Sequence, residues 1–208
     1  RGAPPEPDAV PSGPLIEETA PGRPASPQTL HGLLRDRGDE ALFEHYFTSR
    51  LAVVGLDGSP PRRLGAPGLI LDHRQSPDGR YLLVRRLKRP FSRTVAAGAF
   101  PMEVEVLDLD GAVVRRLADL PVREAEIGPG PRAFQWREDA DATLAWVEAS
   151  AAGGDRLLTL DAPFVGAPTP LVELSGRFGR VLWGRADLAL VVSAAPGQPG
   201  LRTLIDPS

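Results

Sequence analysis

The sequence predicts an all-β protein: a partial β-propeller of about three to four antiparallel blades, preceded by a disordered proline-rich leader and one short helix. The first observation is a threefold self-similarity, in which a turn-forming cluster leads into an apolar run. The three segments begin at Ser76, Trp136 and Trp183, so their starts lie 60 and 47 residues apart. Such spacing is typical of propeller blades, which hold four strands in about 40–50 residues. The second observation is composition, because 22 Gly and 23 Pro among 208 residues favour a turn-rich chain over a helical one.

Residues 1–28 are predicted to form the disordered leader. Eight of the prolines fall in this stretch, which holds few large apolar residues. Such a segment cannot bury enough surface to offset the entropy lost on ordering. Pro4 and Pro7 also form a P-x-x-P motif, so a polyproline ligand for a partner is the alternative, but the flexible leader is favoured.

Residues 29–49 are predicted to be a helical lead-in, with one helix from about 39 to 48. Asp39 is a plausible N-cap and Glu40 falls in the first turn, where a negative charge is favourable. The periodicity then changes from helical to strand-like at Thr48 and Ser49. The apolar residues that recur at helical spacing are Leu42, Phe43, Tyr46 and Phe47.

Residues 50–208 are predicted to be the partial propeller domain. Short apolar runs alternate there with turn signals, of which Asp57-Gly58, Asp78-Gly79 and Asp110-Gly111 are the clearest. We expect three to four small antiparallel sheets whose last blade lacks a covering neighbour, so that the fragment alone is marginally stable. The expected strands are 51–54, 62–64, 69–71, 81–84, 102–107, 112–117, 134–136, 143–147, 156–160, 171–174, 181–183, 188–192 and 201–205.

Charge and composition exclude several classes of function. The formal net charge of −3 gives no electrostatic case for nucleic acid as a partner. Cysteine is absent, which excludes disulfides and thiolate chemistry. No apolar run approaches the roughly 18 residues that a membrane span needs, so no membrane partner is expected. The chain begins at Arg1 rather than Met, so we expect that a start has been cut away; the compartment stays open, with a periplasmic or secreted location slightly favoured.

Several longer strings resemble the glutamyl endopeptidase subgroup of the prolyl oligopeptidase family of serine peptidases. They occur in readable order over about residues 29–155, and the turn Ser76-Pro-Asp-Gly-Arg-Tyr-Leu resembles the propeller repeat of that family. The strings are Asp39-Glu-Ala-Leu-Phe-Glu-His-Tyr46, Thr48-Ser-Arg-Leu51, Arg89-Pro-Phe-Ser92, Phe100-Pro101, Glu103-Val-Glu-Val106, Leu117-Ala-Asp-Leu-Pro121, Gly130-Pro-Arg132, Trp136-Arg137 and Trp146-Val-Glu148.

The resemblance implies that this chain is the propeller portion of a two-domain enzyme. In that family an α/β-hydrolase domain carries a Ser-Asp-His triad, and the propeller caps it and filters substrates. A nucleophile elbow needs G-x-S-x-G, and no serine here has glycine two residues away on both sides. We therefore expect no catalytic residues in this chain, which alone should hydrolyse no peptide, and a hydrolase domain as C-terminal partner. A peptide is the implied substrate, with cleavage after glutamate as the specificity that the resemblance implies, and no cofactor is expected.

The candidate substrate-binding residues are Arg89, Arg86 and Arg93. They belong to a run of five cations without a carboxylate, Arg85 to Arg93, and Arg89 lies in one of the family-like strings. An arginine fork matches the geometry of a carboxylate, so the run could select glutamate side chains. The alternative, which we favour, is a solvated loop or ion pairs with acidic neighbours such as Glu103 and Glu105.

Other candidate sites have simpler interpretations. Trp136, Trp146 and Trp183 could form a stacking platform, but one buried aromatic residue per blade is commoner. The aspartates at 108–110 and 139–141 could suggest calcium, but turn chemistry explains them better. His31, His45 and His73 lack metal-ligand spacing, so no metal site is predicted.

Two other functions stay open. The runner-up is a non-catalytic β-propeller scaffold for protein–protein interaction, and the third is a ligand-binding repeat protein. The sequence after Ser208 would separate these hypotheses, because a G-x-S-x-G motif there would favour the peptidase.

Overall fold

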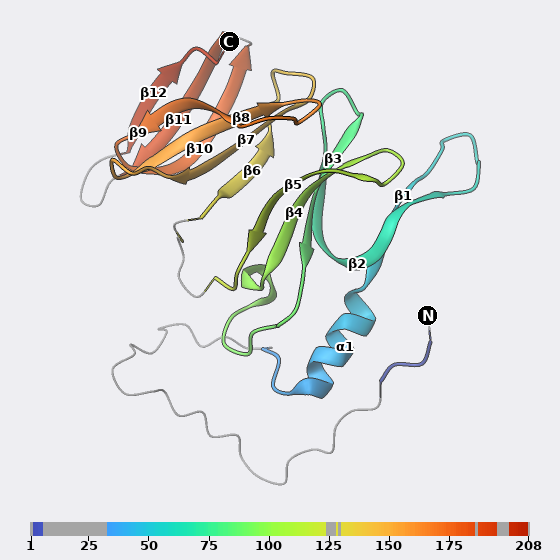
Figure 1. The fold of residues 1–208 in the computed structure, drawn as a ribbon. Coiled ribbons are helices and arrows are strands. Elements are labelled where there is room, and N and C mark those ends of the chain that lie inside the picture. Colours follow the sequence, from blue (N-terminus) through green and yellow to red (C-terminus); the bar gives the residue numbers. More distant parts are fainter. Residues whose placement is uncertain are drawn as a thin grey trace, which may run out of the picture.

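The computed structural model describes residues 2–5, 33–123, 128, 130–185, 187–194 and 200–207. Most of the predicted leader, residues 6–28, lies outside the described residues. The described chain forms one helix, α1 (Arg37–Phe47), and then three antiparallel sheets in sequence order (Figure 1). The prediction of a mostly β chain with one short helix before small antiparallel sheets is confirmed, whereas the number of propeller blades stays a prediction.

The first sheet has five strands in the order β1-β2-β3-β4-β5, the second has four in the order β6-β7-β8-β9, and the third has three in the order β10-β11-β12. A short 3-10 helix, η1 (Ala97–Ala99), precedes β4. The strands are β1 (Ser49–Val53), β2 (Arg62–Gln75), β3 (Tyr81–Leu87), β4 (Met102–Asp108), β5 (Val113–Leu120), β6 (Arg132–Trp136), β7 (Thr143–Ala149), β8 (Asp155–Asp161), β9 (Thr169–Leu174), β10 (Arg177–Arg185), β11 (Leu188–Ala194) and β12 (Leu201–Ile205).

The helix begins earlier than its sequence pattern predicts. Asp36, not Asp39, is the N-cap: its backbone is extended and its carboxylate accepts a hydrogen bond from the Asp39 N–H at 2.9 Å. The prediction of Asp39 as N-cap is therefore wrong, since Asp39 lies inside the first turn and its carboxylate is hydrogen-bonded by Arg35 at 2.9 Å. Of the predicted apolar face, Phe43 packs edge-on against Phe91, with ring centroids 5.3 Å apart.

The two predicted runs 62–64 and 69–71 form one long strand, β2, because a bulge joins them. Leu51 of β1 lies opposite Leu64 and Ser49 lies opposite Gly68, so β2 carries extra residues between these pairs. Gly65 adopts a φ of +56° there and lies against Gly111 of the β4–β5 turn. A Cβ on Gly111 would lie 2.1 Å from the Gly65 nitrogen, so this crossing requires glycine.

Two apolar cores join the three sheets. The first core packs the inner faces of the first and second sheets together and includes Trp136 and Trp146, as the core interpretation of these residues predicts. The Trp136 Nε1–H also donates to the Arg74 carbonyl oxygen at 2.9 Å, which satisfies the buried indole. The second core lies between the second and third sheets and includes Val147 and Val191.

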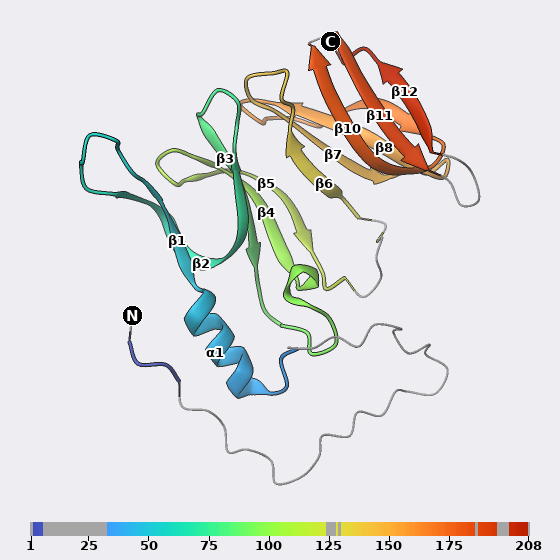
Figure 2. The same ribbon diagram turned by 180° about the vertical axis from the view of Figure 1, so that it is seen from behind.

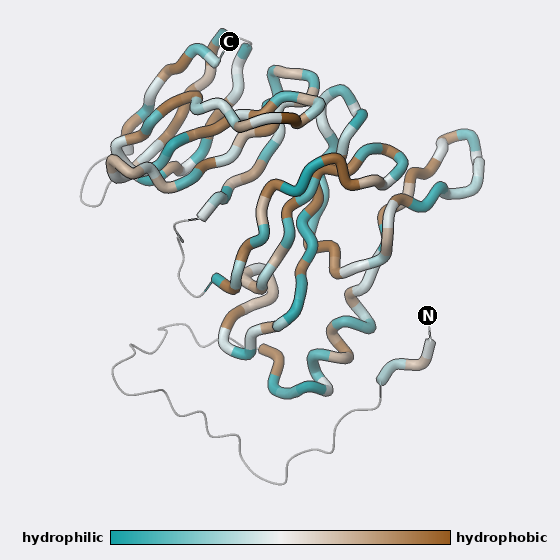
Figure 3. The backbone as a smooth tube through the Cα atoms, in the orientation of Figure 1, coloured by the Kyte–Doolittle hydropathy of each residue, from teal (hydrophilic) through white to brown (hydrophobic). Residues whose placement is uncertain are grey.

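The sheets therefore follow one another across the molecule, with α1 at one end and β12 at the other (Figures 1 and 2). The hairpin of β1 and β2 projects from the first sheet as an arm. Hydrophobic and hydrophilic stretches alternate along most strands and along α1 (Figure 3). Alternation is typical of a sheet with one buried face, whereas β7 of the second sheet is buried almost throughout because a core lies on each side of it.

The Pro-Asp-Gly turn that starts the first repeat is built as the sequence predicts. Gly79 has a φ of +76°, and the Asp78 carboxylate accepts hydrogen bonds from the Ser76 hydroxyl at 2.6 Å and the Arg80 N–H at 3.0 Å. The Asp78 N–H donates to the Asp141 carbonyl oxygen at 2.9 Å. This turn thus also links the first sheet to the second.

Candidate functional site

The arginine-rich segment runs from the end of β3 into the loop before η1. Each of its five cations has a carboxylate partner in the structure. The ion pairs are Arg85 with Asp72, Arg86 with Glu105, Lys88 with Asp119, Arg89 with Glu40 and Glu44, and Arg93 with Glu40. The segment is thus a set of internal ion pairs that ties the loop to α1 and to the neighbouring strands.

Arg89 uses its whole fork within the chain. Its Nε and Nη2 donate to the two oxygens of Glu44 at 2.8 and 2.9 Å, and its Nη1 donates to Glu40 at 2.7 Å. The guanidinium carbon also lies 4.7 Å from the centre of the Phe91 ring. The hydrogen bonds from Glu44 and Glu40 raise the pKa of Arg89. A substrate carboxylate would have to displace these partners.

Glu40 is the shared acceptor of the cluster. Its side chain is only 12% exposed and lies between Arg89 and Arg93, which is 3.1 Å away. The hydrogen bond from Arg89 is the main cause that lowers the pKa of Glu40, with a further contribution from Arg93. The predicted substrate residues Arg89 and Arg93 are therefore brought together, but around a carboxylate of α1.

Arg86 lies apart from that pair, on the strand β3. It lies 3.5 Å from the buried carboxylate of Glu105, which Arg116 also contacts at 3.2 Å. The favoured interpretation named Glu105 as an acidic neighbour of the arginine run, and this pairing is present. The substrate role of Arg86, Arg89 and Arg93 stays a prediction.

A cavity of about 510 Å³ opens next to the arginine segment, between β3, β4 and β5 of the first sheet and the beginning of β6. Its walls are mainly apolar, and three arginines reach them: Arg85, Arg123 and Arg132. The apolar lining includes Phe100, Met102, Val104, Leu120 and Phe134. An apolar cavity with a few charged groups is the usual form of a ligand site.

The three arginines of the cavity are held differently. Arg132 forms an ion pair with the fully buried Asp155, and Arg85 donates to Asp72 at 2.8 Å. Arg123 is anchored by its backbone, whose N–H donates to the Ala99 carbonyl oxygen at 2.8 Å. Within the described part of the chain, its guanidinium has no hydrogen bond or ion pair. Among the described residues, Arg123 therefore differs from Arg85 and Arg132, whose guanidinium groups have carboxylate partners.

This cavity is not predicted by the sequence patterns, although both arginines lie at family-like strings. Arg123 follows the string that ends at Pro121, and Arg132 ends the string Gly130-Pro-Arg132. Arg123 and Arg132 come together through the packing of two sheets, because β5 belongs to the first sheet and β6 to the second. No local pattern in the sequence predicts how closely two sheets pack.

The aspartate at 108 follows the turn interpretation, whereas His31 lies outside the described residues. The Asp108 carboxylate accepts the N–H groups of Asp110 and Ala112, both at 2.9 Å, so it closes the β4–β5 turn. The ring of His45 lies 5.0 Å from that of Tyr46. Among the described residues, no group of three or more His, Cys, Asp or Glu is placed to hold a metal ion. No helix within the described ranges is long and apolar enough to cross a bilayer.

Comparison with known proteins gives two curated relatives and no matching family model. One is "Probable glutamyl endopeptidase, chloroplastic" from Oryza sativa subsp. japonica, which is 35% identical over 92% of this chain. The other bears the same name, comes from Arabidopsis thaliana, and is 36% identical over 92% of this chain. The chain spans only 22% and 21% of these proteins, about a fifth of their length.

One similar solved structure is an uncharacterized protein from Listeria monocytogenes EGD-e. The TM-score is 0.49 at 16% identity, and the match covers 77% of this chain and 44% of that protein.

Proposed function

We propose, from the premise that this chain is a relative of the glutamyl endopeptidases, that it forms the part of a serine peptidase that admits and filters peptide substrates. The premise rests on the two curated relatives and agrees with the motif strings in the sequence. The observation that carries the proposal is their 35–36% identity over 92% of the chain. The catalytic triad, in this proposal, belongs to an α/β-hydrolase partner domain.

The architecture supports a propeller-like role. Three antiparallel sheets follow in sequence order, and successive sheets pack face against face through the two apolar cores. Consecutive propeller blades pack in this way. We propose that these sheets are consecutive blades of a propeller that covers the catalytic domain.

The cavity between the first sheet and β6 supports contact with an acidic peptide. Its apolar floor suits the aliphatic part of a side chain, and the guanidinium of Arg123, which has no partner among the described residues, suits a carboxylate. We place the preference for acidic side chains on Arg123 first. Arg89, Arg86 and Arg93 remain the residues proposed from the sequence, although their present partners are carboxylates of this chain.

Arg123→Ala in the natural full-length protein tests this proposal. We expect kcat/KM for peptides with glutamate to fall about ten- to a hundredfold, since a charge-assisted hydrogen bond contributes about 1.5–3 kcal/mol. Peptides with glutamine at the same position should be cleaved as before. Arg180→Ala is the matched control, because Arg180 on β10 is exposed and its side chain has no partner in the described ranges.

Two outcomes would contradict the proposal. An equal loss on glutamate and glutamine peptides would show that Arg123 does not select charge. Failure of a serine-directed fluorophosphonate to label the full-length protein would reject the peptidase itself and favour the non-catalytic scaffold.

A further inference from the structure

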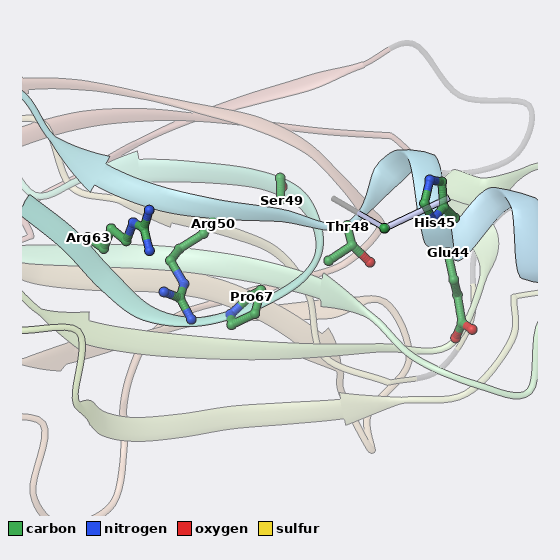
Figure 4. Close-up of a pocket in the computed structure, with 8 residues that line it drawn as sticks. Glu44, His45, Thr48, Ser49, Arg50, Arg63 and Pro67 are labelled. Atoms are coloured by element: carbon green, nitrogen blue, oxygen red, sulfur yellow. The ribbon is translucent and has the colours of Figure 1, made fainter. Parts of the chain in front are cut away.

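We propose that the hollow at the base of the β1–β2 arm is a binding site for a small phosphate monoester. The hollow measures about 740 Å³ and lies where α1 ends and β1 begins (Figure 4). Glu44, His45 and Thr48 line it from the helix side, Ser49 and Arg50 from β1, and Arg63 and Pro67 from β2. The inference concerns a site separate from the arginine cavity and does not depend on the peptidase proposal.

Two guanidinium groups face this hollow without a partner. Within the residues that the structure describes, the side chains of Arg50 and Arg63 have no hydrogen bond or ion pair. They contrast with Arg89 nearby, whose fork is occupied by Glu40 and Glu44. Like charges that lie close on a sheet repel one another, so a bound anion would relieve the repulsion between Arg50 and Arg63.

The two arginines lie on neighbouring strands beside the hollow. Arg63 lies directly opposite Ala52, which Arg50 precedes by two residues on β1, so Arg50 stands where the register of the pair shifts. Both residues line the same hollow, where two long side chains can reach one group. Figure 4 shows both guanidinium groups beside the path of the hairpin, on the Pro67 side of the hollow.

The fixed charges around the hollow favour an anion. Glu44 is the carboxylate in its wall, and both of its oxygens accept hydrogen bonds from Arg89. The C-terminal end of α1 contributes about half a negative charge. Arg50 and Arg63 supply two full positive charges, which exceed the partial negative charge of the helix end, so the net charge around the hollow is positive.

The wall on the β2 side is held in place by contacts within the fold. The bulge between Leu64 and Gly68 turns Pro67 toward the hollow. Gly65 lies against Gly111, and the Arg86 Nη1 donates to the Ala66 carbonyl oxygen at 3.4 Å. A wall fixed in this way loses little freedom when a ligand binds.

The arrangement favours phosphate over a single carboxylate. Each guanidinium can bind two oxygens in parallel, so two forks match a group with more than two oxygens and more than one negative charge. A phosphate monoester has both properties, and the volume of about 740 Å³ leaves room for a small organic part. The ligand class is therefore a small phosphorylated molecule or inorganic phosphate itself.

Titration of the chain with inorganic phosphate, glycerol phosphate and acetate tests the proposal. The Nε–Hε signals of Arg50 and Arg63, observed by NMR, should move with both phosphates and much less with acetate at equal ionic strength. Arg50→Ala and Arg63→Ala should each weaken the affinity for phosphate about tenfold or more. Stronger binding of glycerol phosphate than of phosphate would identify a phosphate ester as the ligand, and equal binding would identify free phosphate.

Arg74→Ala is the matched control, because Arg74 lies on the same strand, is exposed, and has no side-chain partner among the described residues. It should bind phosphate like the unaltered chain. Thermal unfolding of each variant without ligand should be unchanged, which separates lost binding from lost folding. Equal signal shifts with acetate, or equal affinity in Arg50→Ala, Arg63→Ala and Arg74→Ala, would overturn the proposal, and neither result depends on peptidase activity.

Discussion

Two clusters of arginines around carboxylates hold this chain together, and they differ chiefly in their exposure to water. One is centred on Asp155 of β8, whose side chain is 0% exposed and contacts Arg132 of β6 and Arg177 of β10. The other is centred on Glu40 and Glu44 of α1, whose side chains are 12% and 40% exposed and whose partners are Arg89 and Arg93. Both join elements that are distant in the sequence.

From this difference we expect burial, rather than the number of ion pairs, to set the contribution of a cluster to stability. A carboxylate removed from water depends on every partner that it has, so the loss of one member leaves an uncompensated group. Asp155 also accepts the Phe178 N–H at 2.7 Å, which links the second sheet to the third. The α1 cluster can exchange its pairs for water at little cost.

Removal of the buried carboxylate should give the largest effect. Asp155→Ala leaves Arg132 without its buried partner and the Phe178 N–H without its acceptor, so we expect a loss of about 3–5 kcal/mol in the free energy of unfolding. Urea denaturation measures it. Asp187→Ala is the control, because its pair with Arg185 is 65–76% exposed, and it should change stability by less than about 1 kcal/mol. Similar losses in the two variants would contradict the role of burial.

The pH dependence of unfolding should report the same cluster. Burial raises the pKa of Asp155, but hydrogen bonds from Arg132 and the Phe178 N–H more than offset it, so the pKa is below its usual value. The contribution to stability is therefore complete above the unfolded pKa of about 4 and is lost as the pH falls through the lower folded pKa. Asp155→Asn should remove this part of the acid dependence. An unchanged acid profile in Asp155→Asn would show that other carboxylates control it.

Substitution in the α1 cluster should lower the free energy of unfolding by less. Glu40→Gln weakens the pairs with both Arg89 and Arg93, and we expect a loss of up to about 1 kcal/mol, confined to α1. Hydrogen exchange should show faster opening of the helix amides and unchanged protection in β7 and β8. A global loss of protection would mean that α1 unfolds together with the sheets.

The smallest effect concerns Arg89 and its predicted substrate role. Arg89→Lys keeps the charge but loses the planar fork, so stability should fall by only a few tenths of a kcal/mol. If the contacts with α1 are its main role, Arg89→Ala in the full-length protein will change kcat/KM equally for acidic and neutral peptides. A loss restricted to acidic peptides would instead support Arg89 as a substrate residue.

Local patterns in the sequence predict the elements of this fold well. The switch from helical to alternating periodicity at Thr48 matches the end of α1, and the Asp78-Gly79 and Asp110-Gly111 turns match strand boundaries. The N-cap was misplaced because Asp36 and Asp39 both suit that position, and only the extended backbone of Asp36 decides between them.

Contacts between residues that are distant in the sequence could not be predicted from the sequence patterns. Glu40 of α1 and Arg89 of the loop after β3 lie 49 residues apart in the sequence. Their spacing alone therefore could not predict that this loop contacts the helix. The same holds for Arg123, whose place in a cavity depends on how two sheets pack. The continuity of β2 was missed because Gly65 and Gly68 signal a break, whereas the chain uses them in a bulge.

The contact between Gly65 and Gly111 has a consequence for the order in which this chain can fold during synthesis. The bulge of β2 contacts the β4–β5 turn, where Gly111 follows Gly65 by 46 residues in the sequence. Close to this contact, Arg62 donates to the Leu109 carbonyl oxygen at 2.6 Å. Until that turn has left the ribosome, β2 can pair with β1 and β3, but its bend lacks the contacts with Gly111 and with the Leu109 carbonyl oxygen. The arm and the hollow at its base therefore reach their final shape only after the β4–β5 hairpin has closed.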